Sequence, residues 1–382
     1  MMTPLPPSQS STILVPNLSA SWQTPVDEYV VALQPLASDP AVLMVATATG
    51  ELLALHAQTG EILGRVQAHQ EACTQACVVV SPQGFANPQE GLSEPAVLTA
   101  GDGGLLCGWR WQAQAKTWEP VFQTRLGRHW VEHLAVAYPY VLAALDRQVV
   151  VLSLTGQEVR RITLPKAVLA LAWQPGSSTG GNQPRFATAC YGQVALWQLG
   201  NDTPTLIREM PFTPTLLRWQ PRGRFLAYGC RERAVFVIPL GPHTTGRPED
   251  DLRMEGFTHK VSLLAWSEDN RYLATGGGPD PIVWSFAGKG PAHNPPLELL
   301  AHRAVLSAGV FQSGNPLASH RLATASAEGS ILIWNLPTVD RPEAVALASP
   351  ETQGGEITTL HWSSTHPLLS GDANGLVSCW NL

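Results

Sequence analysis

Short stretches of alternating apolar and polar residues recur along the chain, and each is followed by a turn-forming sequence. The clearest copy spans residues 322–336, where two apolar runs flank a turn at Glu328 and Gly329. Alternation with a period of two indicates a strand, and a turn containing Gly between two such runs predicts a β-hairpin. A hairpin cannot bury its own apolar face, so we expect it to stack on similar units.

The same hairpin recurs with a fixed spacing between a hydroxyl residue and a tryptophan. The spacing from Thr324 to Trp334 is repeated at residues 99–109 and 370–380, and it is one residue shorter at 188–197 and 275–284. With these hairpins the chain resembles the WD-repeat β-propeller family. The resemblance implies four-stranded blades that are arranged as a ring around a central axis.

Eight such units can be recognised by their third strands, which are expected at residues 52–56, 105–111, 149–152, 194–199, 234–238, 282–286, 331–336 and 377–382. Inner strands are expected at residues 29–33, 77–80, 131–137, 169–173, 216–219, 261–266, 307–311 and 358–362. The period of roughly 40 to 55 residues is typical of four-stranded blades. We therefore predict an all-β single propeller of eight blades, with seven, the commonest number in the family, as the alternative. Blades one and three should be the most degenerate, because Leu55 and Leu152 replace the tryptophan.

The chain ends on a third strand, so its last blade needs a fourth strand from elsewhere. Residues 12–22, with an apolar run at 13–15 and Trp22, precede the first inner strand. In the family the N-terminal segment closes the ring in this way, and closure removes two exposed strand edges. Residues 12–382 are therefore expected to form the propeller, and the Pro- and Ser-rich residues 1–11 a disordered tail.

The composition fits one large domain made by repetition. Charged residues make up 14% of the 382 residues, and 33 Gly and 32 Pro favour short strands and tight turns. A net charge of −6 does not resemble a nucleic-acid footprint, and no apolar run approaches the roughly 20 residues needed to insert into a membrane. Six cysteines are too few for a disulfide framework in this length and suit a reducing cytoplasm.

Four residues match the structural tetrad of the family, which consists of His, Ser or Thr, Asp and Trp. They are His302, Thr324, Glu328 and Trp334, with Glu328 in place of the usual Asp. Two looser copies are also present. One consists of His69, Thr99, Asp102 and Trp109, and the other of His259, Thr275, Asp280 and Trp284. A histidine beside a hydroxyl and a carboxylate also suits a catalytic triad, but the resemblance implies buried networks that tie a loop to its blade.

His69, Cys73 and Cys77 follow one another at a spacing that suits a metal site. Zn²⁺ needs both sulfurs about 2.3 Å away, whereas two residues four apart on a strand are separated by roughly 13 Å. Small buried thiols are therefore the preferred interpretation, and we expect neither a metal nor a cofactor.

Two functions of different classes remain. The first is a non-catalytic scaffold that binds other proteins, which is the usual role in the family. The alternative is an enzyme or metal-handling protein that uses the central channel or the His69/Cys73/Cys77 region, although the sequence has no phosphate loop, HExxH motif or paired carboxylates.

A candidate partner-binding surface follows from the resemblance. In the family, turns between middle and third strands share one face with the connections that lead into inner strands. Aromatic and Arg residues dominate interface energetics, and here they stand beside other polar residues on that face. The alternative is a solvated rim with one stray tryptophan. The candidates are Arg128, His129, Trp130, Asp146, Arg147, Tyr191, Arg231, Glu232, Arg233, His259 and Lys260.

Overall fold

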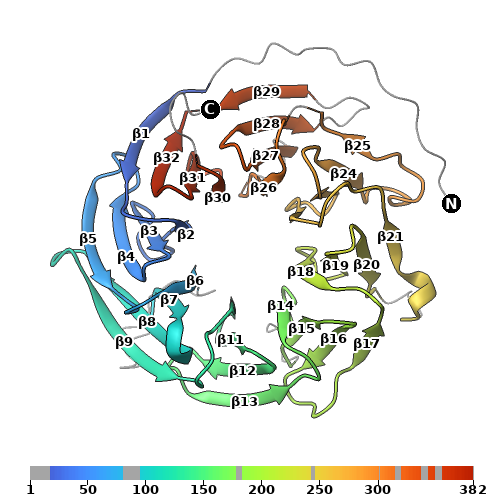
Figure 1. Cartoon of the computed structure of the whole chain (residues 1–382), viewed down its shortest axis with the longest axis horizontal. Helices are drawn as coiled ribbons and strands as arrows, with labels where there is room; N and C mark the ends of the chain where they lie inside the picture. The colour runs from blue at the N-terminus through green and yellow to red at the C-terminus, as the bar shows by residue number, and fades with distance from the viewer. Residues whose placement is uncertain are drawn as a thin grey trace.

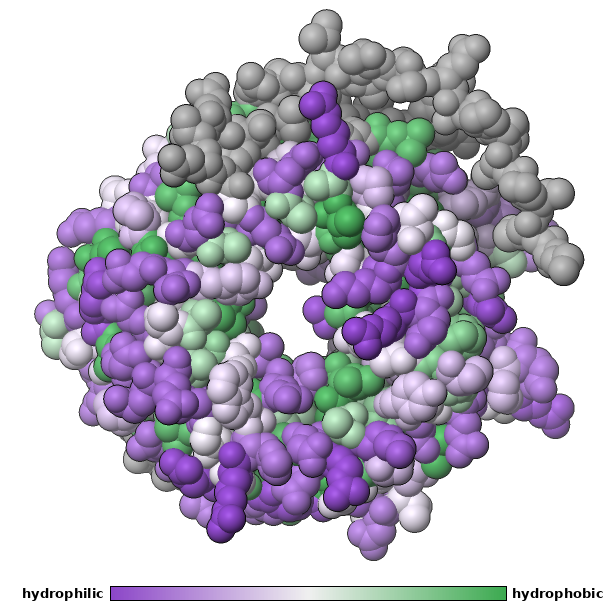
Figure 2. Space-filling model, viewed as in Figure 1, coloured by the Kyte–Doolittle hydropathy of each residue, from purple (hydrophilic) through white to green (hydrophobic). Residues whose placement is uncertain are grey.

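In the computed structural model, eight four-stranded antiparallel sheets form a ring around a central channel (Figure 1). The structure describes residues 18–80, 95–177, 183–241, 246–300, 302–314, 320–336, 343–348 and 355–381. The prediction of an all-β propeller with eight blades is confirmed, and the alternative of seven blades is wrong. Figure 2 shows the central opening, with hydrophilic residues over much of the face in view.

The blades are numbered in chain order. Blade 1 contains β2 (Val30–Pro35), β3 (Val42–Thr47), β4 (Glu51–His56) and β5 (Ile62–Gln67), and blade 2 contains β6 (Cys73–Val78), β7 (Val97–Gly101), β8 (Leu105–Gln112) and β9 (Thr117–Arg125). Blade 3 contains β10 (His133–Ala137), β11 (Tyr140–Leu145), β12 (Gln148–Ser153) and β13 (Glu158–Thr163), and blade 4 contains β14 (Val168–Trp173), β15 (Arg185–Cys190), β16 (Gln193–Gln198) and β17 (Leu206–Glu209).

The second half of the ring repeats this order. Blade 5 contains β18 (Pro214–Trp219), β19 (Phe225–Cys230), β20 (Val235–Pro239) and β21 (Leu252–Met254), and blade 6 contains β22 (Leu263–Trp266), β23 (Tyr272–Gly276), β24 (Ile282–Ser285) and β25 (Leu297–Glu298). Blade 7 contains β26 (Leu306–Phe311), β27 (His320–Ser326), β28 (Ile331–Leu336) and β29 (Glu343–Ala348), and blade 8 contains β30 (Ile357–His361), β31 (Leu368–Asp372), β32 (Leu376–Trp380) and β1 (Ala20–Pro25).

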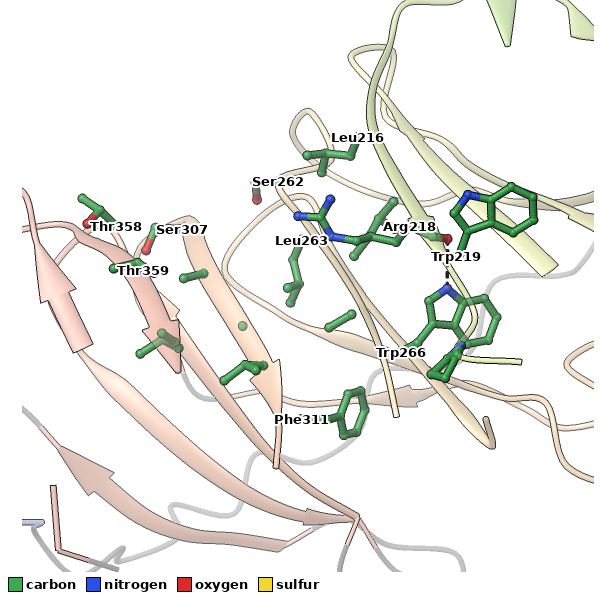
Figure 3. Close-up of a pocket in the computed structure, with 17 residues that line it drawn as sticks. Leu216, Arg218, Trp219, Ser262, Leu263, Trp266, Ser307, Phe311, Thr358 and Thr359 are labelled. Carbon is green, nitrogen blue, oxygen red and sulfur yellow. Dashed lines mark hydrogen bonds between the residues drawn. The ribbon is translucent and has the colours of Figure 1, made fainter. Parts of the chain in front are cut away.

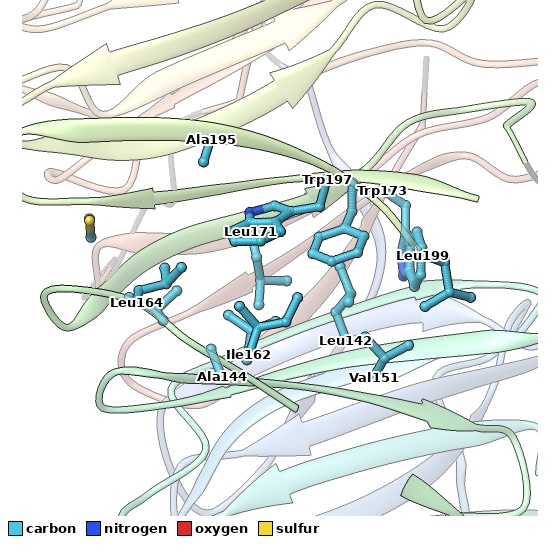
Figure 4. Packing of buried hydrophobic residues seen from close by; sticks show 14 residues of the cluster. Leu142, Ala144, Val151, Ile162, Leu164, Leu171, Trp173, Ala195, Trp197 and Leu199 are labelled. Atoms are coloured by element: carbon cyan, nitrogen blue, oxygen red, sulfur yellow. The ribbon is translucent and has the colours of Figure 1, made fainter. Parts of the chain in front are cut away.

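The hydrophobic core lies between the blades. Every residue of the middle strands β3 and β7 is buried, because a neighbouring blade covers each face of the sheet. Eight apolar clusters are present among the described residues, and each joins two adjacent blades. The cluster between blades 3 and 4 packs Leu142 and Val151 against Trp173 and Trp197 (Figure 4). No blade therefore buries its apolar surface alone, as the repeat pattern predicts.

Three tryptophans at the ends of inner strands link consecutive blades. The indoles of Trp173, Trp219 and Trp266 donate to inner-strand carbonyls of the preceding blade, those of Ala135, Ala172 and Arg218, each at 3.2 Å. These bonds pair the indole N–H groups and connect each blade to the one before it.

The N-terminal strand closes the ring, as predicted, but with different bounds. β1 pairs antiparallel with β32, and its residues run from Ala20 to Pro25 instead of 12–22. The Trp22 indole donates to the Ala57 carbonyl at 3.2 Å, and its ring lies over Gly60, where a Cβ would collide with it. This contact with blade 1 sets the position of the closing strand. Residues 1–17, including the predicted tail at 1–11, lie outside the described residues.

The inner strand of blade 2 also differs from its predicted bounds. It is β6, which begins at Cys73 and ends at Val78, whereas residues 77–80 were expected. The strand begins four residues earlier than expected, and its polar Thr74 donates to the Ala100 carbonyl at 3.0 Å within the sheet. Inner strands border the channel and need not be apolar on both faces.

Ring closure can be tested by truncation. Deletion of residues 1–25 removes β1 and exposes the edge of β32, so we expect a lower melting temperature and aggregation. Deletion of residues 1–8 leaves β1 intact and should be nearly neutral. Size-exclusion chromatography and thermal unfolding measure both, and equal behaviour of the two truncations would contradict closure by β1.

Candidate functional site

Five hairpins contain a buried hydrogen bond from a tryptophan to a hydroxyl. The indole on the third strand donates to a Thr or Ser on the middle strand at 2.8 to 2.9 Å, in the pairs Trp109–Thr99, Trp197–Thr188, Trp284–Thr275, Trp334–Thr324 and Trp380–Ser370. Blades 1, 3 and 5 have Leu55, Leu152 and Ile238 at the third-strand position instead, all fully buried. Blade 5 is thus a third departure from the repeat that the sequence reading did not single out.

In blade 7 this bond extends into a longer network. The His302 Nε2 lies 2.8 Å from the Thr324 hydroxyl, which also accepts the Trp334 indole at 2.8 Å. The His302 Nδ1 lies 3.1 Å from the Ser330 hydroxyl, and Ser330 donates to the Glu328 carboxylate at 3.2 Å. Glu328 therefore reaches the histidine only through Ser330. Sequence reasoning missed this serine, whose signal was a hydroxyl next to the turn glycine.

The other two sets of tetrad residues differ from each other. In blade 2, the His69 Nε2 lies 2.9 Å from the Thr99 hydroxyl, and its Nδ1 is 3.9 Å from the Asp102 carboxylate. In blade 6 the predicted set does not form. His259 is exposed, and its Nδ1 lies 3.0 Å from the Thr258 hydroxyl. The His259 amide donates to the carbonyl of Gly277 in the hairpin turn at 2.7 Å, while its exposed ring contacts Thr258 instead of the buried Thr275.

The buried histidines are neutral structural groups. Burial lowers the pKa of His302 to about 4 and also lowers the pKa of His69, despite the opposing effect of Asp102. His69 and His302 are 1% and 7% exposed. The Thr324 hydroxyl is occupied by the indole and the imidazole, so this arrangement offers no accessible nucleophile for triad chemistry.

Cys73 and Cys77 lie on the same strand, β6. Burial raises the pKa of each thiol to about 12, which keeps both protonated, whereas a metal ligand must be a thiolate. Within the described ranges, no group of three or more His, Cys, Asp or Glu side chains is placed to hold a metal ion. All six cysteines of the chain are free thiols.

All eleven candidate partner-binding residues are exposed. They lie on the connections into inner strands or on the turns between middle and third strands, and we call the face formed by these segments the turn face. Arg128, His129, Asp146 and Arg147 line one depression of about 360 Å³ at the start of blade 3. Trp130 follows directly and is 49% exposed.

The connection that carries Trp130 is fixed at both ends. The Leu126 amide donates to the Gly104 carbonyl at 2.8 Å, and the Val131 amide donates to the Gly101 carbonyl at 3.1 Å. Leu126 and Val131 are themselves buried. The main chain on both sides of the exposed indole is therefore anchored to blade 2.

The remaining candidates lie on separate segments and do not line this depression. Tyr191 is 59% exposed on the turn of blade 4. Arg231, Glu232 and Arg233 form the turn of blade 5, and His259 and Lys260 precede blade 6. The Glu232 carboxylate accepts hydrogen bonds from the Thr213 amide at 2.8 Å and hydroxyl at 2.7 Å, so it serves to hold its own turn.

Two further exposed apolar residues of the turn face were missed. Tyr29 is 42% exposed and Leu300 is 52% exposed. The sequence reading placed Tyr29 in an inner strand, but β2 begins one residue later. Together with Trp130 and Tyr191, they make four of the seven exposed large apolar side chains among the described residues. All three exposed aromatic side chains among these seven, Tyr29, Trp130 and Tyr191, lie on this face.

Comparison with known proteins agrees with this geometry. Residues 347–381 match the family described as WD domain, G-beta repeat. The C-terminal WD40 domain of Sif2 superimposes with a TM-score of 0.71 at 12% identity, over 97% of this chain and 99% of that one. The chain has the fold of a WD-repeat β-propeller.

Two other solved structures share this propeller fold. The computationally designed Ika8 protein has a TM-score of 0.71 at 16% identity, over 94% of this chain and 98% of that one. Sqt1 of Saccharomyces cerevisiae has a TM-score of 0.69 at 11% identity, over 96% of this chain and 98% of that one. WD-repeat propellers generally bind proteins and are generally non-catalytic.

Curated relatives match the WD-repeat propeller over part of its length. Protein HIR1 of Cryptococcus neoformans var. neoformans serotype D is 29% identical over 161 residues, and Protein HIR1 of Mycosarcoma maydis is 29% identical over 133 residues. These alignments cover 38% and 31% of this chain, but 17% and 12% of the two relatives. No helix in the described part of the propeller is long and apolar enough to cross a membrane.

The histidine's share of the blade 7 network can be isolated with two matched variants. Thr188→Val leaves one buried donor unpaired, the Trp197 indole, and should lower the free energy of unfolding by about 1–3 kcal/mol. Thr324→Val leaves both the Trp334 indole and the His302 Nε2 unpaired, so it should lower the free energy of unfolding by about 1–3 kcal/mol more than Thr188→Val does. Denaturant unfolding measures both, and equal losses would show that His302 contributes nothing.

Because of His302, the stability of the folded chain should decrease as the pH falls. Its pKa is about 4 in the folded chain and about 6.5 when unfolded, so between these values only the unfolded state takes up the proton. The contribution of neutral His302 to the free energy of unfolding is complete above about pH 6.5 and is lost as the pH falls toward 4. His302→Gln should reduce the loss of stability between pH 7 and pH 5 by about 2 kcal/mol. An unchanged pH profile in this variant would contradict a neutral buried imidazole.

Proposed function

We propose that this chain is a non-catalytic platform that binds other proteins on its turn face, over blades 3 to 5. The observation that carries the proposal is the group at the start of blade 3, where exposed Trp130 stands beside a depression lined by Arg128 and Arg147. Trp and Arg are the residue types most enriched among those that dominate binding energy at protein interfaces.

The geometry of this group suits binding in two ways. The anchors at Leu126 and Val131 hold the connection before any partner arrives, so less conformational entropy is lost on association. The depression of about 360 Å³ can receive one side chain. The Asp146 carboxylate lies 3.9 Å from the Arg147 Nε, so the two guanidinium groups and one carboxylate of the depression leave one net positive charge. That charge favours an acidic residue of the partner, since Arg forms forked hydrogen bonds with carboxylates.

The other candidates extend the proposed surface without sharing the depression. Tyr191 and Arg231 would contact a partner large enough to span the turns of blades 4 and 5. His259 and Lys260 lie at the far end of the surface. Tyr29 and Leu300 belong to the same face near blades 1 and 7, and a second contact there would use them.

The alternative of an enzyme or metal-handling protein at His69, Cys73 and Cys77 has less support. His69 is almost wholly buried, and no group of three or more His, Cys, Asp or Glu side chains in the described segments is placed to hold a metal ion. We further propose that the partners are proteins and not nucleic acid, and that the chain works in the cytoplasm, where its six free thiols stay reduced.

The experiment is affinity capture with the intact chain, followed by measured affinities for the recovered partner. Trp130→Ala and Arg147→Glu should each weaken binding at least about tenfold, the loss expected at a hot spot. Arg231→Glu tests whether the surface extends to blade 5. Val159→Ala and Arg65→Glu, which change exposed residues on outer strands, are the matched controls and should bind like the original chain. Equal affinity of all five variants would refute the proposed surface.

A further inference from the structure

Blades 4 and 5 form a polar depression on the face opposite the turn face. Its volume is about 310 Å³, and it lies where the connections from inner to middle strands of the two blades meet. Arg185, at the start of β15, and Arg222, on the connection between β18 and β19, both line it and are exposed. The other described residues that line it include no Asp or Glu, and they are Gln174, Pro175, Gly176, Ser177, Gln183 and Gln198.

The two guanidinium groups of this depression have no carboxylate beside them. Within the segments that the structure describes, neither Arg185 nor Arg222 forms an ion pair. The sequences of the two connections, residues 174–184 and 220–224, also contain no Asp or Glu. The depression therefore gathers two positive charges in a chain whose net charge is −6. Such a group favours carboxylates of a partner, with which Arg forms forked hydrogen bonds.

A smaller apolar recess adjoins the depression, and the two share Gln174 and Arg185. The recess has a volume of about 170 Å³. An apolar cavity of about 150 Å³ can take up a molecule of the size of benzene, so the recess has room for one apolar side chain. The rest of its wall is mainly apolar and consists of Phe186, Leu196, Leu206, Trp219 and Leu240, together with the exposed Thr205.

Hydrogen bonds hold the two connections in place around the depression. The Gln174 side chain donates to the Gly223 carbonyl at 2.8 Å, and this bond joins the connection of blade 4 to that of blade 5. The Ser177 hydroxyl donates to the Gln174 carbonyl at 2.7 Å and accepts the Arg185 amide at 3.1 Å. Because the main chain on both sides is already fixed, less conformational entropy is lost when a partner binds.

Trp219 forms the part of the recess wall that belongs to the inner strand of blade 5. Its indole donates to the Ala172 carbonyl at 3.2 Å, which holds the ring against blade 4. In Figure 3 the Trp219 ring and the Arg218 guanidinium extend to opposite sides of β18. Arg218 lines neither the depression nor the recess, so the charges of this site are those of Arg185 and Arg222.

We propose that this site binds an extended segment of a second partner protein, in which an apolar side chain stands next to acidic residues. The apolar side chain enters the recess, and the acidic side chains contact Arg185 and Arg222. A small molecule fits less well, because the apolar part of the site is smaller than the roughly 300–1,000 Å³ of small-molecule pockets. The site is separate from the turn face, so it stands or falls independently of the proposed function.

The test is fluorescence anisotropy of a labelled peptide that is titrated with the intact chain at low ionic strength, where charge contacts are least screened. The probe carries the central sequence Glu-Leu-Glu between Gly-Ser flanks. One matched peptide replaces both glutamates by glutamine, and the other replaces the leucine by serine. We expect the probe to bind with a Kd below about 1 mM, and each matched peptide at least about tenfold more weakly.

Variants of the chain locate the binding site of the probe. Arg185→Gln and Arg222→Gln should each weaken its binding, and the two substitutions together should do so at least about tenfold. Thr205→Phe fills the recess from an exposed position and should remove the preference for leucine over serine. Arg224→Gln removes the same charge from an exposed residue that lines neither the depression nor the recess, and it should leave the affinity unchanged.

Four results would overturn the proposal. They are no binding of the probe, equal binding of either matched peptide, equal weakening by Arg224→Gln and Arg222→Gln, and binding of hexanoate as tight as that of the probe. The last result would show that the site takes a small acid instead of a segment of a protein.

Discussion

Burial of each sheet between two neighbours is the constraint on which this structure depends. Each of the eight apolar clusters joins two adjacent blades, so every blade needs both neighbours to exclude water from its middle strands. A ring satisfies this need only when it is closed. The pairing of β1 with β32, and the docking of Trp22 on Gly60, therefore complete an interface of the same kind as the other seven.

The polar networks follow from this packing. A tryptophan that fills the space between blades brings an indole donor into a dry interior, and a threonine or serine on the adjacent strand accepts it. Where Leu55, Leu152 or Ile238 fills the same space, no acceptor is needed. His302 ties the connection before blade 7 to the same hydroxyl, and burial keeps its imidazole neutral.

Repetition made most of this fold predictable from the sequence. A hydroxyl and a tryptophan at a fixed spacing revealed the hairpins, and their number gave the eight blades. The errors occurred where a contact between distant segments decides the outcome. The position of β1 depends on Trp22 meeting Gly60, and the role of Ser330 depends on the length of Glu328, which no spacing rule contains. Likewise, the sequence predicted that Arg128 and Arg147 share a face, but only the structure shows that they line one depression.

The central claim is that the ring gathers its exposed aromatic residues on the turn face and that the partner binds there. Hydrogen exchange of the chain, measured with and without its recovered partner, tests this claim most directly. We expect amides of residues 127–131 and 145–148 to gain protection in the complex, while the connection between β18 and β19 on the opposite face exchanges as before. Protection confined to the opposite face would contradict the account.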